Sequence, residues 1–268
     1  MNNKVVIITG ASSGIGKACA EKFGVEGAKL VITGRNEVNL LETANWLTQK
    51  GIDVLAVTSD VGIKNDCKRV IDETIAKYGK VDVLINNAGI SMRALLNEAE
   101  LSVIEQVMQI NFYGTLYCTK YALPYLLKSK GSVVGVSSIA GFIGLPGRTG
   151  YSASKFAMQG FLEALRTENL KTGLHVMIAC PGFTASNIRN TALSANGSAQ
   201  GESPREEDKM MTAEKVADHI YNGVIGRKRQ IVLTTQGKLV VFLSKFFPAF
   251  VSKMVFKAMA KEPNSPVS

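Results

Sequence analysis

The sequence is poor in the residues that build metal and redox sites. Its four cysteines are scattered along the chain, at Cys19, Cys67, Cys118 and Cys180. No two of them form a CxxC pair, so neither a zinc site nor a redox-active pair is predicted. The two histidines, His175 and His219, have no partner at a metal-ligand spacing. We therefore expect no metal ion, and we interpret each cysteine as a small core residue in a reducing compartment.

Apolar runs long enough to cross a bilayer are missing as well, since none reaches the roughly 20 residues that a membrane-spanning helix needs. The opening residues, MNNK, lead directly into the strand-like run VVIIT. That leaves no room for the charged and apolar regions of a cleavable signal peptide, and we expect none. These features favour a cytoplasmic protein.

Acidic residues are scarce near the C-terminal end. The net charge is +9, and the residues from 226 on hold eight of the 31 Lys and Arg residues but one of the 22 Asp and Glu residues. No module with interleaved basic and stacking aromatic residues is recognisable, so no nucleic-acid partner is expected. A basic and apolar tail instead favours contact with an anionic membrane surface or a protein partner.

What the sequence does contain is a regular alternation of strand-like and helix-like segments. The 268 residues are 46% hydrophobic and 20% charged, as in an ordinary globular protein. The predicted strands are residues 5–9, 29–33, 54–58, 81–85, 132–137, 174–179 and 230–234. Strands without polar alternation, separated by helices, are typical of a parallel sheet covered on both faces. We predict a single α/β domain with three layers, a doubly wound parallel sheet of the Rossmann type.

Two segments depart from this alternation. Residues 183–211 are rich in Ser, Asn, Gly and charge and are long for a connection, so we interpret them as a loop over the substrate. Residues 236–268 form a basic, amphipathic extension of the catalytic domain 1–235, and Pro248 is expected to divide it into two helices. This extension has three candidate contacts: a lipid interface, the substrate pocket of its own chain, or a partner subunit.

The octapeptide TGASSGIG, residues 9–16, follows the first predicted strand and opens a helix. A glycine turn alone is a weak signal, but this position is the one that a dinucleotide-binding loop requires. Gly10 permits a tight turn, while Gly14 and Gly16 let the backbone approach a pyrophosphate and the helix pack closely. The free N–H groups at the start of the helix would bind the phosphates.

The residues after the second predicted strand bear on the choice of dinucleotide. NAD-preferring sites usually carry an acidic residue here, but this chain has Gly34 followed by Arg35 and Asn36. A guanidinium group pairs with a phosphate in bidentate fashion, so Arg35 favours NADP(H). The alternative is that Arg35 is a solvated surface arginine.

The motif YSASK, residues 151–155, places a phenol and an ammonium on one helix face, because residues i and i+4 are neighbours on a helix. A carbonyl that accepts hydride also needs a proton, and a free tyrosine with a pKa of about 10 exchanges protons poorly near neutrality. Positive charge from Lys155 and from an oxidised nicotinamide would lower the pKa of Tyr151. Tyr151 is therefore predicted to be the general acid in reduction and the base in oxidation.

Six features occur in the order and approximate spacing of one known family: TGASSGIG, NNAG at 86–89, Asn111, Ser138, YSASK and Pro181–Gly182. On these features the chain resembles the classical short-chain dehydrogenase/reductase (SDR) family over residues 4–235. The resemblance implies a Rossmann fold, a nicotinamide cofactor and hydride transfer at a carbonyl or a secondary alcohol. It implies four catalytic residues, namely Asn111, Ser138, Tyr151 and Lys155.

The resemblance also implies individual roles. Ser138 would orient the substrate oxygen toward Tyr151, and Asn111 would hold water in a proton relay to Lys155, which would also bind the nicotinamide ribose. Asp60 would contact the adenine amino group, and Thr184 would reach the nicotinamide amide. The other implied cofactor-binding residues are Ser12, Ser13, Ile15, Val61, Asn87, Ala88, Gly89, Pro181 and Gly182, besides the glycine-loop residues, Arg35 and Asn36 named above.

The end of the chain departs from the family pattern. Many members finish with a Val-Asp-Gly-Gly segment that is absent here. This ending is similar to that of members acting on lipids or steroids, which implies an NADPH-dependent reductase of a hydrophobic ketone, peripheral at a membrane surface. Oxidation of a secondary alcohol, reduction of an acyl-carrier thioester or a sugar, and a non-catalytic nucleotide-sensing scaffold remain open alternatives. The resemblance further implies a homodimer through the helices that carry Asn111 and Tyr151, with a tetramer left open.

Overall fold

The computed structural model describes residues 1–204, 206 and 210–267. Within these residues, short runs rich in β-branched and apolar side chains form the strands of one sheet. The strands are β1 (Val5–Thr9), β2 (Lys29–Gly34), β3 (Val54–Thr58), β4 (Val83–Asn86), β5 (Ser132–Val136), β6 (His175–Cys180) and β7 (Gln230–Val232). All seven predicted strands are confirmed, with ends that differ by at most two residues.

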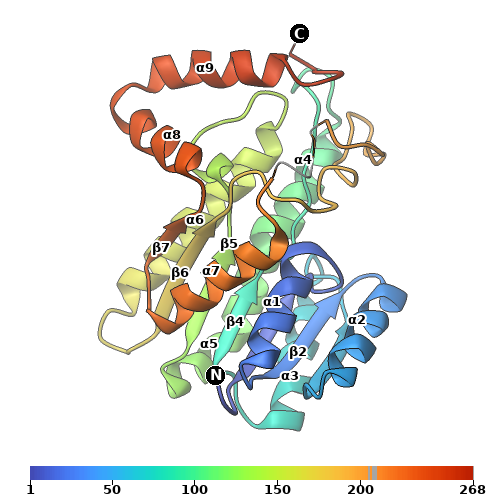
Figure 1. Ribbon diagram of the computed structural model, residues 1–268, viewed down its shortest axis with the longest axis vertical. Helices are drawn as coiled ribbons and strands as arrows, with labels where there is room; N and C mark the ends of the chain where they lie inside the picture. The colour runs from blue at the N-terminus through green and yellow to red at the C-terminus, as the bar shows by residue number, and fades with distance from the viewer. Residues whose placement is uncertain (205, 207–209, 268) are drawn as a thin grey trace.

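The sheet has the order β3-β2-β1-β4-β5-β6-β7, and each neighbouring pair is parallel. The chain therefore winds outward in one direction from β1 to β3 and in the other from β4 to β7 (Figure 1). In such sheets ligands bind beyond the carboxyl ends of the strands, at the point where the order reverses. The doubly wound Rossmann architecture predicted from the sequence is confirmed.

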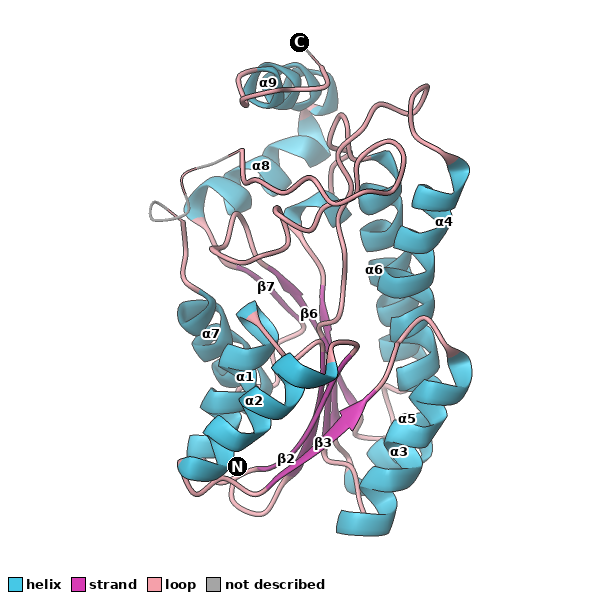
Figure 2. Cartoon of the chain, turned by 90° about the vertical axis from the view of Figure 1, so that its right-hand side faces the viewer, coloured by secondary structure: helices cyan, strands magenta, loops and turns pink. Residues whose placement is uncertain are grey.

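Helices cover both faces of this sheet, as Figure 2 shows. One face carries α1 (Gly14–Val25), α2 (Glu37–Gln49) and α7 (Ala213–Ile225), and the other carries α3 (Lys64–Tyr78), α4 (Leu101–Met108), α5 (Gly114–Ser129) and α6 (Thr149–Glu168). Ile8 and Ile32 pack toward Phe23 on the first face, whereas Ile7 and Val31 belong to the core on the second. Because both faces are buried, the strands show no polar alternation.

Two irregular turns interrupt this pattern beside the predicted site. The π-helical turn η1 (Gln109–Tyr113) joins α4 to α5 and contains the fully buried Asn111. A short 3-10 helix, η2 (Ile139–Gly141), follows β5. Single π turns inside helices often occur at functional sites. The sequence predicted one helical stretch across η1, because hydrophobic periodicity does not reveal a turn that holds one extra residue.

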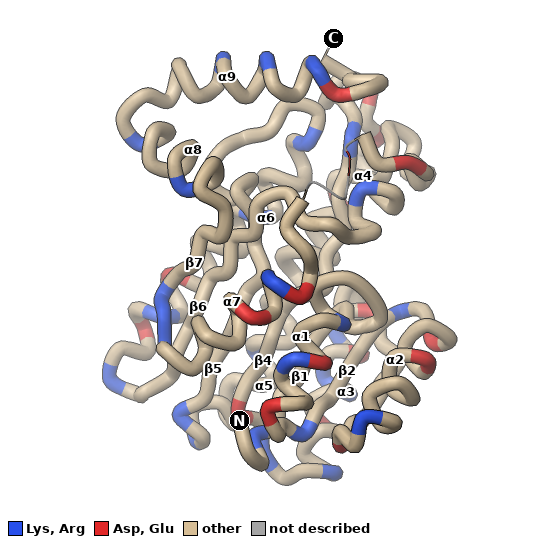
Figure 3. Tube along the Cα trace, viewed as in Figure 1, with Lys and Arg blue, Asp and Glu red and all other residues tan. Residues whose placement is uncertain are grey.

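The C-terminal extension forms two helices, α8 (Thr235–Phe246) and α9 (Pro248–Ala260), divided at Pro248 as predicted. They lie beyond the carboxyl ends of the strands, far from the N-terminus (Figure 1). Basic residues recur along both helices, and the acidic residue of this segment follows α9 (Figure 3). Among the described residues, no helix combines the length and the apolar character needed to span a bilayer.

Candidate active site

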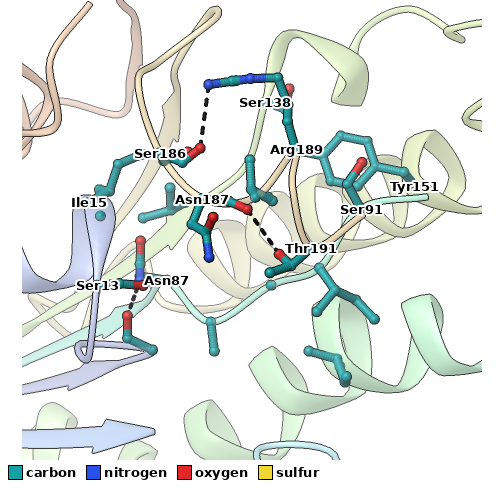
Figure 4. Close-up of a pocket in the computed structure, with 18 of the residues that line it drawn as sticks. Ser13, Ile15, Asn87, Ser91, Ser138, Tyr151, Ser186, Asn187, Arg189 and Thr191 are labelled. Carbon is teal, nitrogen blue, oxygen red and sulfur yellow. Dashed lines mark hydrogen bonds between the residues drawn. The ribbon is translucent and has the colours of Figure 1, made fainter. Parts of the chain in front are cut away.

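A cavity of about 790 Å³ runs along the carboxyl ends of the central strands. Arg35, Asn36, the glycine loop, Ser138 and Tyr151 all line it. In Figure 4, Ser13 and Ile15 of the glycine loop lie on one side of this cavity, and Ser138 and Tyr151 lie on the other. Every predicted catalytic or cofactor-binding residue lines this cavity apart from three, namely Gly16, Asp60 and Asn111. Asp60 lines a smaller pocket that shares Arg35 with this cavity. The fold thus brings motifs that are far apart in the sequence into one continuous space.

The glycine loop between β1 and α1 has the geometry of a phosphate cradle. Gly10 has a φ of 65°, and a Cβ atom there would lie 2.8 Å from the Cα atom of Ala88. A Cβ atom on Gly16 would overlap the Gly10 carbonyl oxygen, so the first turn of α1 has no room for a side chain at this position. Asn87 Nδ2 fixes the turn by donating to that same carbonyl (3.0 Å). The first N–H groups of α1, beside Ser13, therefore face the cavity, which fits the pyrophosphate of a dinucleotide.

Arg35, which follows β2, and Asp60, which follows β3, lie close together. The Arg35 NH1 atom is 4.0 Å from Asp60 Oδ2, and the Arg35 side chain is 52% exposed. Asp60 Oδ1 accepts a hydrogen bond from the Gly62 N–H (2.8 Å), and Asn36 Oδ1 caps α2 by accepting from the Asn39 N–H (2.9 Å). Asp60 and Asn36 thus have structural hydrogen bonds of their own, while Arg35 supplies positive charge suited to a phosphate.

Tyr151 and Lys155 lie one helical turn apart in the first turns of α6. The Lys155 Nζ atom is 5.6 Å from the centre of the Tyr151 ring and donates a hydrogen bond to the Val136 carbonyl (3.0 Å). Ser138 follows β5 and caps η2, where its Oγ atom accepts from the Ala140 N–H (3.2 Å). The end of β5 and the start of α6 therefore bring the phenol, the ammonium and the serine hydroxyl together.

Burial shifts the pKa values of Tyr151 and Lys155 in opposite directions. Burial raises the pKa of Tyr151, although hydrogen bonding with Ser138 and the positive charges of Arg148 and Arg189 act in the opposite direction. Burial also lowers the pKa of Lys155 to about 8. The predicted lowering of the Tyr151 pKa included the charge of an oxidised nicotinamide, so it stays a prediction for the protein with its cofactor bound. Desolvation disfavours the phenolate more than the surrounding groups favour it.

Asn111 is held in η1 by hydrogen bonds to the protein itself. Its Oδ1 atom accepts from the Ile90 N–H (2.8 Å), and its Nδ2 atom donates to the Ile90 carbonyl (2.9 Å) and to Ser154 Oγ (2.9 Å). A Cβ atom on Gly89 would lie 3.1 Å from Asn111 Oδ1 and 3.5 Å from Lys155 Nζ, so both groups border the same small gap. Asn111 thus ties the segment after β4 to α6, and its part in a water relay stays a prediction.

The Pro181–Gly182 corner follows β6 and turns the chain across the cavity. A Cβ atom on Gly182 would lie 2.8 Å from Thr234 Oγ1, so the corner packs closely on the residue that caps α8. Thr184 Oγ1 donates to the Gly182 carbonyl (3.3 Å). The described part of the predicted substrate loop then contributes Phe183 and Ile188, among others, to the cavity wall. Of the predicted loop 183–211, residues 205 and 207–209 lie outside the described residues.

Sequence reasoning missed three charged residues beside the site. Arg148, which precedes α6, and Arg189, in the loop after β6, both line the cavity. Glu262, which follows α9, contacts Arg148 through its Oε2 atom. Arg148 and Arg189 lie in loops, where no periodicity marks a residue as buried or facing a ligand. For Glu262 the one available signal was a lone acidic residue in a basic tail.

The chain belongs to the short-chain dehydrogenase/reductase family. The family model described as short chain dehydrogenase matches residues 4–197, a range that includes the glycine loop, Tyr151 and Lys155. The resemblance stated from the sequence is confirmed. The protein is therefore an oxidoreductase of this family.

Its curated relatives include proteins from animals and plants. The mouse protein named dehydrogenase/reductase SDR family member 7B is 34% identical over 271 residues, which cover 99% of this chain and 84% of the relative. The Arabidopsis thaliana protein named 11-beta-hydroxysteroid dehydrogenase-like 4A is 35% identical over 253 residues, which cover 92% of this chain and 82% of the relative. Both alignments extend beyond the residues that the family model matches.

Solved structures share the fold. A short-chain dehydrogenase/reductase from Burkholderia phymatum in complex with NAD aligns with a TM-score of 0.83 and 25% identity, covering 93% of this chain and 95% of that chain. An alcohol dehydrogenase from the archaeon Thermococcus sibiricus, complexed with 5-hydroxy-NADP, aligns with a TM-score of 0.77 and 22% identity, covering 87% and 96%. One structure holds NAD and the other an NADP derivative, so the preference of this chain must come from its own residues.

Proposed function

We propose that this protein reduces a hydrophobic, lipid-like or steroid-like ketone to a secondary alcohol with NADPH, and that Tyr151 donates the proton. The observation that carries this proposal is the position of Tyr151, beside Ser138 and one turn before Lys155, in the same cavity as the glycine loop. A proton donor and a dinucleotide cradle that share one space are what carbonyl reduction requires.

The residues present fit a nicotinamide dinucleotide, because the glycine loop leaves open the space that side chains at Gly10 and Gly16 would fill. When bound, this cofactor supplies the hydride. The chain's own groups do the rest: Ser138 donates a hydrogen bond that orients the carbonyl oxygen, and Tyr151 delivers the proton to it. Lys155 keeps positive charge beneath the phenol ring. In alcohol oxidation the same tyrosine takes the proton back.

The preference for NADPH rests on the charge after β2. Gly34 occupies the position where an acidic residue would bind ribose hydroxyls, and the next residue, Arg35, lines the cavity with a half-exposed side chain. A carboxylate is present nearby in Asp60, 4.0 Å from the guanidinium, but it is turned into the Gly62 backbone. A guanidinium placed there suits a 2′-phosphate better than a free hydroxyl.

A hydrophobic substrate is supported by the apolar part of the cavity lining. Besides polar groups, this lining includes the apolar side chains of Ile90, Leu145, Phe183, Ile188 and Leu193. The name of the Arabidopsis relative refers to a steroid dehydrogenase. A pocket of this composition gains binding energy chiefly by burying apolar surface of its ligand.

We also propose that the face of α8 and α9 turned away from the domain contacts an anionic membrane surface. This exposed aromatic face consists of apolar side chains that are between 52% and 63% exposed, namely Leu239, Phe242, Phe246, Phe247, Phe250 and Phe256. Exposed lysines lie among them, at Lys238, Lys245, Lys253 and Lys257. Apolar side chains interspersed with cations match the interfacial region of a membrane with anionic lipids.

The protein is further proposed to be a homodimer through the helices that carry Asn111 and Tyr151. Tyr113 and Phe156, which belong to this helical layer, are 39% and 46% exposed in the single chain. Aromatic residues are enriched at subunit interfaces, and a symmetric dimer would bury both copies of each ring. Light scattering coupled to gel filtration measures the mass, and a monomer at micromolar concentration would contradict the dimer.

The proposed reaction is tested with Tyr151→Phe, a change that removes one hydroxyl and keeps the ring. We expect the reduction rate with NADPH and a panel of hydrophobic ketones to fall by about 10²–10⁴-fold, the usual contribution of a general acid. NADPH binding, followed by its fluorescence, should stay within a few-fold of the parent chain. Full turnover by this variant would refute the mechanism, and an NADH rate equal to that with NADPH would refute the cofactor preference.

A further inference from the structure

The segment that leads into α6 contacts the C-terminal tail. Arg148 directly precedes α6, lines the cavity and lies three residues before Tyr151. Its backbone carbonyl accepts a hydrogen bond from the Ser152 N–H (2.9 Å) in the first turn of the helix. A movement of Arg148 would therefore disturb both the cavity wall and the start of the helix that carries the proton donor.

Glu262 holds Arg148 in a buried ion cluster. The Glu262 Oε2 atom is 3.2 Å from Arg148 NH2 and 3.5 Å from Arg93 NH2. The exposed fractions of the three side chains are 4% for Glu262, 11% for Arg148 and 6% for Arg93. The Arg148 NH1 atom also lies 2.9 Å from the sulfur of Met259 in α9. Ion pairs this well removed from water are weakly screened, so the carboxylate fixes the guanidinium strongly.

Apolar contacts attach the tail to the same segment. Val251, Val255 and Met259 of α9 pack against Ile143 and Leu145 between η2 and α6, and Leu145 also lines the cavity. Nearby, Arg93 NH2 donates to the Pro263 carbonyl (2.7 Å). The tail thus contacts the cavity wall through both apolar packing and ion pairs. Of the three contacts that the sequence left open for the tail, it makes the one with the pocket of its own chain.

The positive charge of Arg148 lowers the pKa of Tyr151. It opposes the effect of burial on the Tyr151 pKa, as do hydrogen bonding with Ser138 and the charge of Arg189, while Cys180 acts in the same direction as burial. Lys155 is a further cation near the phenol, with its Nζ atom 5.6 Å from the centre of the Tyr151 ring. The position of the Arg148 guanidinium is therefore one determinant of how readily Tyr151 ionises.

We propose that Glu262 is a positioning residue for the reaction: by fixing Arg148 against the cavity wall, the tail completes the active site of its own chain. This inference rests on the proposed function, because it assigns Glu262 an effect on proton exchange at Tyr151. The tail accordingly has two faces, one that joins the catalytic wall and the exposed aromatic face described above.

The test compares Glu262→Gln with Arg93→Gln. Both substitutions disrupt the buried cluster, but Glu262→Gln releases Arg148 whereas Arg93→Gln leaves the Arg148–Glu262 pair in place. Alcohol oxidation with NADP⁺ needs ionised tyrosine, so its rate rises with pH through the apparent pKa of Tyr151. In Glu262→Gln we expect this rise to move to higher pH by about one unit. Below the pKa of Tyr151, a shift of one unit lowers kcat/KM about tenfold, so kcat/KM near neutrality should fall by that factor. In Arg93→Gln the rise should stay in place.

Two further variants keep the outcome decisive. Glu262→Asp retains the charge on a shorter side chain and should move the pH rise less than Glu262→Gln does. If Glu262→Gln folds poorly, Glu262→Asp takes its place in the test. Ser252→Ala, an exposed change on α9, should leave the pH profile unchanged. If both Glu262 variants keep the parent pH profile, or if Arg93→Gln moves it equally, the positioning role is refuted. Neither result would touch the proposed function, which fails instead if Tyr151→Phe keeps its activity.

Discussion

At the scale of single residues, the candidate site contains two titratable groups, the half-buried Tyr151 and the buried Lys155, whose pKa values shift in opposite directions. The pKa of Tyr151 is raised by burial, and the pKa of Lys155 is lowered by burial to about 8. In the protein without cofactor, the phenol is therefore protonated at neutral pH and ready to donate, while the ammonium is charged only below about pH 8. Reduction and oxidation should accordingly differ in their pH dependence.

This difference leads to a prediction for Lys155. In the proposed mechanism, ketone reduction uses protonated Tyr151 and charged Lys155, so we expect kcat/KM to fall as the pH rises above about 8, where the lysine loses its proton. In Lys155→Arg the guanidinium stays charged to a pKa above about 12, so the descending limb should move upward in pH. Profiles between about pH 6 and 10 measure it. An unchanged limb in Lys155→Arg would show that another group controls the descent.

The sequence was sufficient to identify some of these residues and not others. Tyr151 and Lys155 belong to one short motif, where helical spacing alone places both side chains on one face. Arg148 and Glu262 are separated by more than a hundred residues and meet only because α9 packs on the loop before α6. Local sequence patterns do not show which distant segments pack together. The contact between the tail and the cavity wall could therefore be found only in the structure.

At the scale of elements, the first βα unit shows why the glycine pattern was a reliable guide. The strand β1 and the helix α1 approach so closely that a Cβ atom on Gly16 would overlap the Gly10 carbonyl oxygen and crowd Asn87. The glycine motif therefore marks a close backbone contact between residues that are six positions apart, and a short sequence motif can specify such a contact. The π turn η1 is the contrasting case, because the surrounding residues have ordinary helical spacing and only the buried Asn111 distinguishes it.

The close approach of β1 and α1 predicts the effect of two matched substitutions. Gly16→Ala inserts a methyl group against backbone, so we expect a loss of about 1–3 kcal/mol in the free energy of unfolding, with weaker NADPH binding. Gly144→Ala, in the exposed loop after η2, meets no neighbouring side chain or distant backbone atom within 4 Å and should change the free energy of unfolding by at most about 0.5 kcal/mol. Denaturant unfolding and NADPH titration measure both. A harmless Gly16→Ala would mean that the loop relaxes freely.

At the scale of the whole molecule, the two ends of the sheet differ in what covers them. The amino ends of the strands are closed by ion pairs such as that between Lys4 and Asp82 (2.8 Å), whereas the carboxyl ends carry the cavity and the two tail helices. The strand order alone placed the cavity at this end. The arrangement of α8 and α9 was not predictable, because an amphipathic pattern shows which side of a helix is apolar but not what covers it.

The exposed aromatic face predicts binding to vesicles that contain anionic lipid. We expect the protein to sediment with vesicles of mixed phosphatidylcholine and phosphatidylserine, and Phe246→Ser and Phe250→Ser to weaken binding by about tenfold each, because each removes a buried aromatic ring from the interface. Leu170→Ser changes an exposed apolar residue far from the tail and should have no effect. Binding that survives both phenylalanine substitutions would exclude this face as the lipid contact.

The packing of α9 on the segment before α6 also bears on how this kind of enzyme diversifies. The parallel sheet and the glycine loop are complete without the last two helices, yet part of the pocket wall is held in place from the tail. Exchanging the tail between two such chains would therefore change the shape of the pocket and, if Glu262 has the proposed role, also the pH at which the reaction runs. Two chains identical up to residue 235 need then share neither a preferred substrate nor a pH profile.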